Sequence, residues 1–259
     1  MEVHHHAHTS RKKWTHYFWE FLMLFLAVFC GFLAEYQLEH KIEKERVKKL
    51  MSDMVENLKY DTTRIGRNAP QNTDLKKDLD SFRLEIKEAI QGRVNSNRLY
   101  YFYLKSQEFG NSFFNKAAIT QLKSSGLLRL VKNDSLVNEL LDYYERKVAG
   151  SEAYRDEVMK ARDAMTQYST DVFKTTGFEF ASAASDTTWS SSMTEQYHAY
   201  LASVLTMNNL DLLSKAPADL ERLHSAALRF EWNIIYYNRF LHLAREAAVR
   251  LIILIDELY

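Results

Sequence analysis

The sequence predicts an all-α protein in which an N-terminal transmembrane helix is followed by an antiparallel helical bundle with long, coiled-coil-like helices. Three observations lead to this fold class. The 259 residues include only seven Gly and two Pro, so helix breakers are few. A run of about twenty mostly apolar residues lies near the N-terminus, which is the length of a membrane-spanning helix. Apolar side chains recur at spacings of three and four over the last forty or so residues, as in a long packing helix.

Composition and charge exclude several classes of function. The 34 basic and 34 acidic residues cancel, so bulk electrostatics predict no nucleic-acid partner. The single cysteine, Cys30, cannot form a disulfide framework or a thiolate zinc site within one chain. No glycine-rich phosphate loop and no Ser-His-Asp arrangement is present. We therefore expect neither an enzyme nor a cofactor.

The apolar run extends from Tyr17 to Tyr36. Its uncharged part, Phe21 to Ala34, covers roughly 21 Å as a helix, and the whole run covers about 30 Å, the thickness of the hydrocarbon layer. Its Leu, Phe and Val residues contribute roughly −3 to −5 kcal/mol to insertion. The run is therefore predicted to partition into a lipid bilayer.

The ends of the run carry aromatic and acidic residues. Trp14, Trp19 and Tyr36 match the aromatic belts that mark the two membrane interfaces. Glu20 and Glu35 lie near the edges, where a carboxylate either snorkels to the headgroups or pairs with a partner helix. We predict that residues 14–36 form a membrane anchor; snorkelling is favoured for Glu35, and both interpretations stay open for Glu20.

Two other interpretations of the run are disfavoured. A signal peptide requires a small-x-small pattern at its cleavage site, and the bulky Phe32, two residues before Ala34, violates that requirement. A soluble core helix is disfavoured because the run is apolar on every face. An uncleaved, single-pass signal-anchor remains.

The orientation of the anchor is left open by the sequence. Residues 11–13 are basic and favour a cytoplasmic N-terminus, with the large domain in the periplasm. Five basic residues follow the run within fifteen positions, and a literal count of them favours the opposite orientation: Lys41, Lys44, Arg46, Lys48 and Lys49. We adopt the periplasmic placement as an expectation.

Four segments are predicted along the chain. Residues 1–13 form a flexible, His-rich basic tail, residues 14–36 the transmembrane helix, residues 37–50 a charged helical stalk, and residues 51–259 the bundle. Within the bundle, the first helix is predicted to run to about Ile65 and to end at "GRNAPQNT". Thr73 is then predicted to cap the next helix, which Gly92 closes.

The remaining helices follow from their breakers and caps. A short helix is predicted in "RLYYFYLKSQEF", and Gly126 is predicted to be a left-handed stop. Asn133 or Asp134 then caps a helix that continues towards Gly177. Residues 181–192 are predicted to be a loop, and residues 193–207 a helix.

The last helix is predicted to start at Pro217, in the first turn. Its apolar stripe comprises Leu220, Leu223, Ala227, Phe230, Ile234, Tyr237, Leu241, Ala244, Ala248, Leu251, Ile255 and Leu258. Ile252, Ile253 and Leu254 widen the stripe, so burial on more than one side is expected there.

One block resembles a known group of proteins. In "LKSSGLLRLVKNDSLVNELLDYYER", Ser125-Gly126, Asn133, Leu136 and Tyr143-Tyr144 resemble a block in uncharacterised single-pass membrane proteins of Bacteroidota-type genomes. The opening "MEVHHHAH" and the junction "FLAEYQLEHKIEKERVKKL" are similar to one branch of that group. The resemblance implies a membrane protein with an N-terminal anchor and a helical domain, and it implies no activity.

Histidine and glutamate patterns supply the candidate metal ligands. His4, His5, His6 and His8 form a cluster able to chelate Zn²⁺ or Ni²⁺, but the favoured interpretation is a flexible tail whose metal affinity is incidental. Two Glu-x-x-His pairs, Glu195-His198 and Glu221-His224, resemble ligand pairs of di-metal carboxylate bundles. Glu221 is predicted to point away from the apolar stripe, which argues against that enzyme.

The sequence therefore predicts a membrane-anchored, non-enzymatic interaction or scaffold protein. Its expected partners are the lipid bilayer and either a second copy, as a homo-oligomer, or another membrane protein. The alternative is a ligand-sensing helical domain that acts through a partner subunit, and the remote alternative is a di-metal enzyme.

Overall fold

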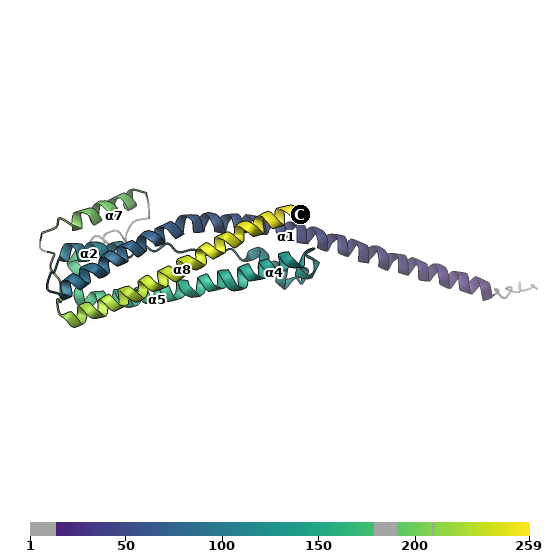
Figure 1. Cartoon of the computed structure of the whole chain (residues 1–259). Coiled ribbons are helices and arrows are strands. Elements are labelled where there is room, and N and C mark those ends of the chain that lie inside the picture. Colours follow the sequence, from purple (N-terminus) through teal and green to yellow (C-terminus); the bar gives the residue numbers. More distant parts are fainter. Residues whose placement is uncertain (1–13, 179–190, 209) are drawn as a thin grey trace, which may run out of the picture.

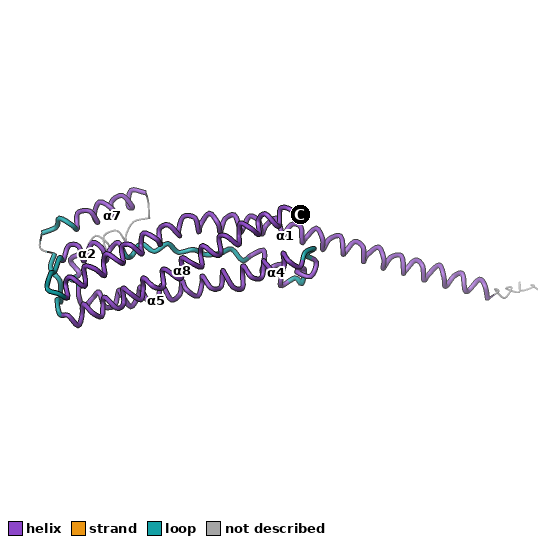
Figure 2. Tube along the Cα trace, viewed as in Figure 1, coloured by secondary structure: helices purple, strands orange, loops and turns teal. Residues whose placement is uncertain are grey.

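A computed structural model describes residues 14–178, 191–208 and 210–259 (Figure 1). The secondary structure in these ranges is helical, apart from an isolated bridge between Phe173 and Leu212 (Figure 2). The predicted all-α fold class is confirmed. Two very long helices, α1 (Trp14–Ile90) and α8 (Pro217–Leu258), dominate the molecule.

Helix α1 is one uninterrupted helix of 77 residues, so the predicted break after Ile65 and the predicted cap at Thr73 are wrong. Pro70 lies inside the helix with its ring exposed. The hydroxyl of Thr73 donates back to the Ala69 carbonyl, 3.0 Å away, and does not cap a new helix. An interior proline costs about 3 kcal/mol, and packing of the opposite, buried face against the bundle outweighs that cost.

Helix α8 follows its predicted stripe closely. Every stripe residue from Leu220 to Ile255 is buried, and Leu258 is half-buried. The predicted widening at the C-terminal end is wrong for Ile253, whose side chain is exposed, whereas Ile252 and Leu254 are half-buried. The buried face of α8 packs against both α1 and α5 (Ala149–Val172).

Three short elements lead from α1 towards α5. Gly92 ends α1 in the left-handed conformation, and Asn95 caps α2 (Ser96–Lys105) through its side chain. A connecting segment, residues 106–116, then leads to α3 (Ala117–Ser124). Gly126 has the predicted left-handed conformation, with φ of 70°, and precedes the 3₁₀ turn η1 (Leu127–Leu130).

The second long helical path starts at Asn133, whose side chain accepts hydrogen bonds from the backbone N–H groups of Ser135 and Leu136. It consists of α4 (Asp134–Asp142), a π-helical turn η2 (Tyr143–Val148) and α5, without interruption. The cap is therefore Asn133, and the helix ends at Val172, before the 3₁₀ turn η3 (Thr175–Phe178) that contains Gly177.

Helix α7 (Ser191–Val204) starts two residues earlier and ends three residues earlier than predicted. Most of the predicted loop, residues 181–190, lies outside the described residues. Tyr197 of α7 donates a hydrogen bond to the Leu104 carbonyl, 3.1 Å away, and so joins α7 to the end of α2.

The N-terminal part of α1 projects beyond the bundle, whereas its C-terminal part lies within it (Figure 1). The C-terminus of α8 lies beside the point where α1 leaves the bundle. Burial in α1 starts at Val47, and Glu43 contacts Arg129 of η1 at 3.4 Å. Packing of α1 against the bundle therefore begins a few residues before the predicted boundary at residue 51.

Candidate functional site

The projecting part of α1 is apolar and exposed. It contains the one segment among the described helices that is long and apolar enough to cross a membrane, with a mean hydropathy of 2.0 over 18 residues and none of that window buried. The rings of Phe21, Phe25 and Phe29 stack along one side, with centroids 6.2 and 5.9 Å apart. No other described element covers this segment, so its apolar side chains are available to lipid.

The residues predicted at the rims of the anchor are all exposed and lie on one continuous helix. Trp14 and Trp19 are at one end, and Glu35 and Tyr36 are at the other. Glu20 contacts His16 one turn earlier, with 3.2 Å between the carboxylate and Nε2. This pair gives Glu20 a partner on its own helix, one turn towards the N-terminus.

A second feature, which sequence reasoning missed, is the route of the connecting segment. Residues 106–116 run along the bundle as a loop, in contact with α1, α5 and α8 (Figure 2). At its centre, Gly110 and Ser112 are buried among helices, so their backbone polar groups need partners. These partners come from side chains, because no neighbouring strand is present among the described elements.

Two asparagines one turn apart on α1 hold the segment. Asn72 binds Gly110 twice: its amide donates to the Gly110 carbonyl at 3.0 Å, and its carbonyl accepts from the Gly110 N–H at 2.9 Å. Asn68 donates to the Asn111 carbonyl at 2.7 Å and to the Ser112 hydroxyl at 2.9 Å. From α8, the hydroxyl of Tyr237 accepts the Ser112 N–H at 2.9 Å. The asparagine side chains thus supply the hydrogen bonds that an adjacent strand would supply in a sheet.

Gly110 is required by this close approach. A β-carbon at this position would lie 2.8 Å from the Asn68 backbone oxygen. We expect Gly110→Ala to lower the free energy of unfolding by about 1–3 kcal/mol, because the backbone of α1 or of the segment must move. Denaturant unfolding of the full chain in detergent measures this.

The matched control is Gly66→Ala on α1, where a β-carbon meets only Arg245 Nε at 4.0 Å. An alanine there raises stability by roughly 0.5–1 kcal/mol, because it favours the helix. Equal effects of the two substitutions would contradict the packing argument.

Asp61 of α1 anchors the end of the same segment and is 1% exposed. Its carboxylate accepts the Asn115 N–H at 3.1 Å and the Tyr143 hydroxyl, at the start of the π-helical turn, at 3.1 Å. Burial raises the pKa of Asp61 to about 6, although both hydrogen bonds and nearby Arg64 oppose the rise. Burial also raises the pKa of Tyr143, so its hydroxyl stays a donor at neutral pH.

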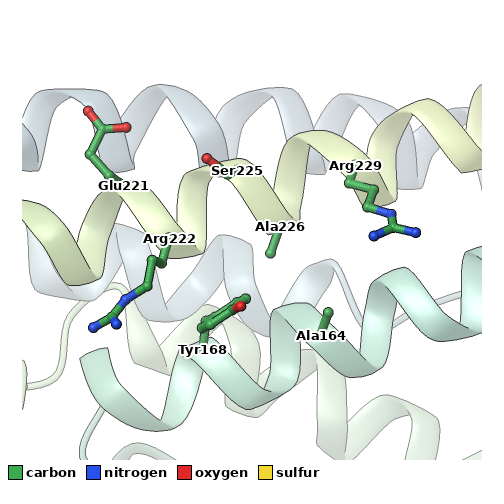
Figure 3. A pocket seen from close by; sticks show the side chains of 7 residues that line it. All are labelled: Ala164, Tyr168, Glu221, Arg222, Ser225, Ala226 and Arg229. Atoms are coloured by element: carbon green, nitrogen blue, oxygen red, sulfur yellow. The ribbon is translucent and has the colours of Figure 1, made fainter.

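A surface groove of about 380 Å³ lies between α5 and α8 (Figure 3). Its lining comprises Ala164, Tyr168, Glu221, Arg222, Ser225, Ala226 and Arg229. Arg222 pairs with Asp219, and Arg229 lies 3.7 Å from Glu157. Figure 3 shows the two guanidinium groups towards the two ends of the groove with Tyr168 between them, whereas Glu221 points away from α5.

The candidate metal ligands do not come together in the part of the chain that the structure describes. No group of three or more His, Cys, Asp or Glu side chains in that part is arranged to hold a metal ion. Glu195 and His198 are exposed on α7, and Glu221 is exposed on α8, as its predicted outward direction requires. The cluster His4, His5, His6 and His8 lies outside the described residues.

No protein-family model, curated protein or solved structure matches the chain. The resemblance to single-pass membrane proteins of Bacteroidota-type genomes therefore stays a prediction.

Proposed function

We propose that this chain is a single-pass protein of a bacterial inner membrane, anchored by residues 14–36, whose helical bundle is a non-enzymatic interaction or scaffold module. The observation that carries the proposal is the continuity of α1, which includes both the exposed apolar segment and the buried helix of the bundle. Between Tyr36 and Val47 about ten helical residues remain, which hold the bundle roughly 15 Å from the membrane surface. We place the bundle in the periplasm.

The anchor is tested by extraction. We expect the full chain to stay with membranes in alkaline carbonate, and Leu26→Arg/Val28→Arg to move it to the supernatant. Two arginines near the centre of the run cost about 5–7 kcal/mol, which exceeds the gain from its apolar residues.

Leu84→Arg is the matched control, because Leu84 is an exposed leucine of the same helix within the bundle. That variant should remain in the membrane fraction. Wild-type protein that washes off with carbonate would contradict the anchor. A C-terminal tag that is cleaved by protease in intact spheroplasts supports the periplasmic placement, and protection until lysis would contradict it.

The groove between α5 and α8 favours one second candidate, a ligand-sensing domain that acts through a partner subunit. Its two guanidinium groups, each shared with a carboxylate, suit a small ligand with two anionic groups. Such a ligand would raise the thermal unfolding temperature of the wild type, and the gain would be lost in Arg222→Gln/Arg229→Gln. Dicarboxylates and diphosphates are the probes.

A further inference from the structure

Guanidinium groups from two long helices lie against one exposed aromatic ring of the connecting segment. Phe113 of that segment is 51% exposed, whereas the next residue, Phe114, packs against the core. The guanidinium carbon of Arg64, on α1, lies 5.2 Å from the centroid of the Phe113 ring. That of Arg155, on α5, lies 5.3 Å from the same centroid. Two helices therefore each supply one cation to this ring.

Tyr60 extends the arrangement along α1. Its ring is exposed, and the ring centroid lies 5.9 Å from the guanidinium carbon of Arg64. Its hydroxyl accepts a hydrogen bond from Arg64 Nη1 at 3.3 Å. Contact with an aromatic ring attracts a guanidinium group and restricts its orientation. We call Tyr60, Arg64, Phe113 and Arg155 the arginine–aromatic row.

Most guanidinium donors of the row have no partner in the part of the chain that the structure describes. A guanidinium group carries five N–H donors. Arg64 uses one of them, to Tyr60, and forms no ion pair with a described residue. Arg155 uses two, both to Asp156 Oδ1, at 3.2 and 2.9 Å. The Asp156 side chain is 59% exposed, so this ion pair is weak and an incoming carboxylate can replace it.

Two further arginines add positive charge beside the row. Arg67 follows Arg64 by three positions on α1, and Arg162 follows Arg155 by two turns on α5. Each lies on the same side of its helix as the first arginine. Neither forms an ion pair with a described residue. The acid nearest to Arg64 in the sequence, Asp61, is buried and already bonded within the bundle. Positive charge therefore exceeds negative charge around the row.

The geometry of the row suits carboxylates. The N–H donors of a guanidinium group lie in its plane, so its edges can bind carboxylate oxygens while its faces contact the rings. The two guanidinium carbons are at most about 10 Å apart, because each lies about 5 Å from the same ring. An extended peptide rises about 3.3 Å per residue, so acids up to three residues apart can reach both arginines. An apolar side chain between those acids would contact the exposed part of Phe113.

The position of the row disfavours lipid and a second copy as its partner. About thirty residues of α1 separate Tyr36 from Arg64, which places the row roughly 40 Å from the predicted membrane surface. That distance is several times the Debye length of about 8 Å. Copies in one membrane project the same way, so their rows would stand at one height and repel each other. The balanced charge of the chain offers little to the phosphate backbone of a nucleic acid.

We propose that the arginine–aromatic row binds an acidic segment of another protein, with carboxylates on both sides of an apolar residue. The inference deepens the proposed interaction function by naming a surface and a class of partner, and it rests on that function. Arginine and exposed aromatic side chains are the residues that most often dominate protein interfaces.

Peptide binding to the full chain in detergent tests the row. The probe is a fluorescent pentapeptide of four glutamates around a central leucine, and its control replaces the glutamates by glutamines. We expect fluorescence anisotropy to show roughly tenfold tighter binding of the glutamate peptide. Arg64→Gln/Arg155→Gln should weaken that binding by roughly tenfold, and Phe113→Ala by about fivefold. Arg250→Gln, at an exposed arginine of α8, is the matched control and should bind like the wild type.

Phe113→Ala keeps the test decisive if the double arginine variant does not fold, because it removes an exposed ring and leaves both charges. Circular dichroism checks the fold of each variant.

Four outcomes overturn the proposal. Equal affinity for the two peptides would show that carboxylates are not recognised. Wild-type affinity in Phe113→Ala, or an equal loss in Arg250→Gln, would place binding outside the row. Tighter binding of a ten-nucleotide oligothymidylate would point to a nucleic-acid partner instead. Displacement of the peptide by free glutarate at equal carboxylate concentration would assign the row to a small molecule.

Carbonate extraction of the same variants separates this proposal from the proposed anchor. A chain that stays in the membrane but does not prefer the glutamate peptide would overturn the row and leave the anchor supported. A chain that binds the peptide but washes off membranes would overturn the anchor and leave the row supported.

Discussion

Replacing Asn72 by alanine is expected to lower the free energy of unfolding by about 2–5 kcal/mol. Asn72 is fully buried, and its side chain satisfies both the N–H and the C=O of Gly110. Alanine removes both partners at once. Each buried polar group that loses its partner costs about 1–3 kcal/mol, and the packed surroundings leave little space for water to replace the amide.

The neighbouring residue provides the control for Asn72. Gln71 also donates to the connecting segment, to the Glu108 carbonyl at 3.3 Å, but it is exposed. Water takes the place of that amide, so Gln71→Ala should cost less than about 1 kcal/mol. Denaturant unfolding followed by circular dichroism measures both variants. If Asn72→Ala were no more harmful than Gln71→Ala, the segment would not depend on this double hydrogen bond.

The second large effect concerns pH. The pKa of Asp61 is raised from its usual value of 3.8 to about 6 in the folded protein, so the folded state binds this proton more tightly than the unfolded state. The stability that protonation gives is fully present below about pH 4 and is lost as pH rises through about 6. Two units of pKa correspond to about 3 kcal/mol, which is the largest change that this single group contributes.

Asp61→Asn isolates that contribution, because other carboxylates also titrate in this range. The amide oxygen still accepts the Asn115 N–H, and the amide group donates to the Tyr143 hydroxyl in place of the reverse bond. Relative to Asp61→Asn, the wild type should therefore lose stability between pH 4 and pH 7. Glu56→Gln makes the same change of charge at an exposed site of α1 and serves as the matched control for that comparison. A constant difference between wild type and Asp61→Asn across this range would show that burial does not hold the Asp61 proton.

Local patterns predicted the elements whose energetics are local. The stripe of α8 was predicted residue by residue, since each stripe position lies on the buried side of a regular helix. The left-handed glycines and the Asn133 cap were also predictable, because their partners lie within a few residues. The exposed apolar segment of α1 stands out for the same reason, since its length and apolarity are properties of one continuous stretch.

The predicted helix break near Pro70 was wrong for the opposite reason, because distant contacts decide the structure there. Proline and the polar residues around it oppose a helix when only neighbouring residues are considered. The structure continues α1 because Asn68 and Asn72, which looked like loop residues, face inward and bind a segment some forty residues away. Their amides on the buried face of a helix carry no signal in the sequence that distinguishes them from turn residues.

The apolar N-terminal segment, the all-α class and the long C-terminal helix follow from the order of apolar and polar residues, because an apolar run is continuous and a helix face is periodic in one chain. Other features depend on contacts between distant positions. Asp61 meets partners 54 and 82 positions away, and Arg83 pairs with the buried Glu231 across 148 positions. The loop of residues 106–116 likewise depends on its route along the bundle. Only packing brings such groups together, and the penalty for leaving a buried polar group without a partner then selects which of them meet.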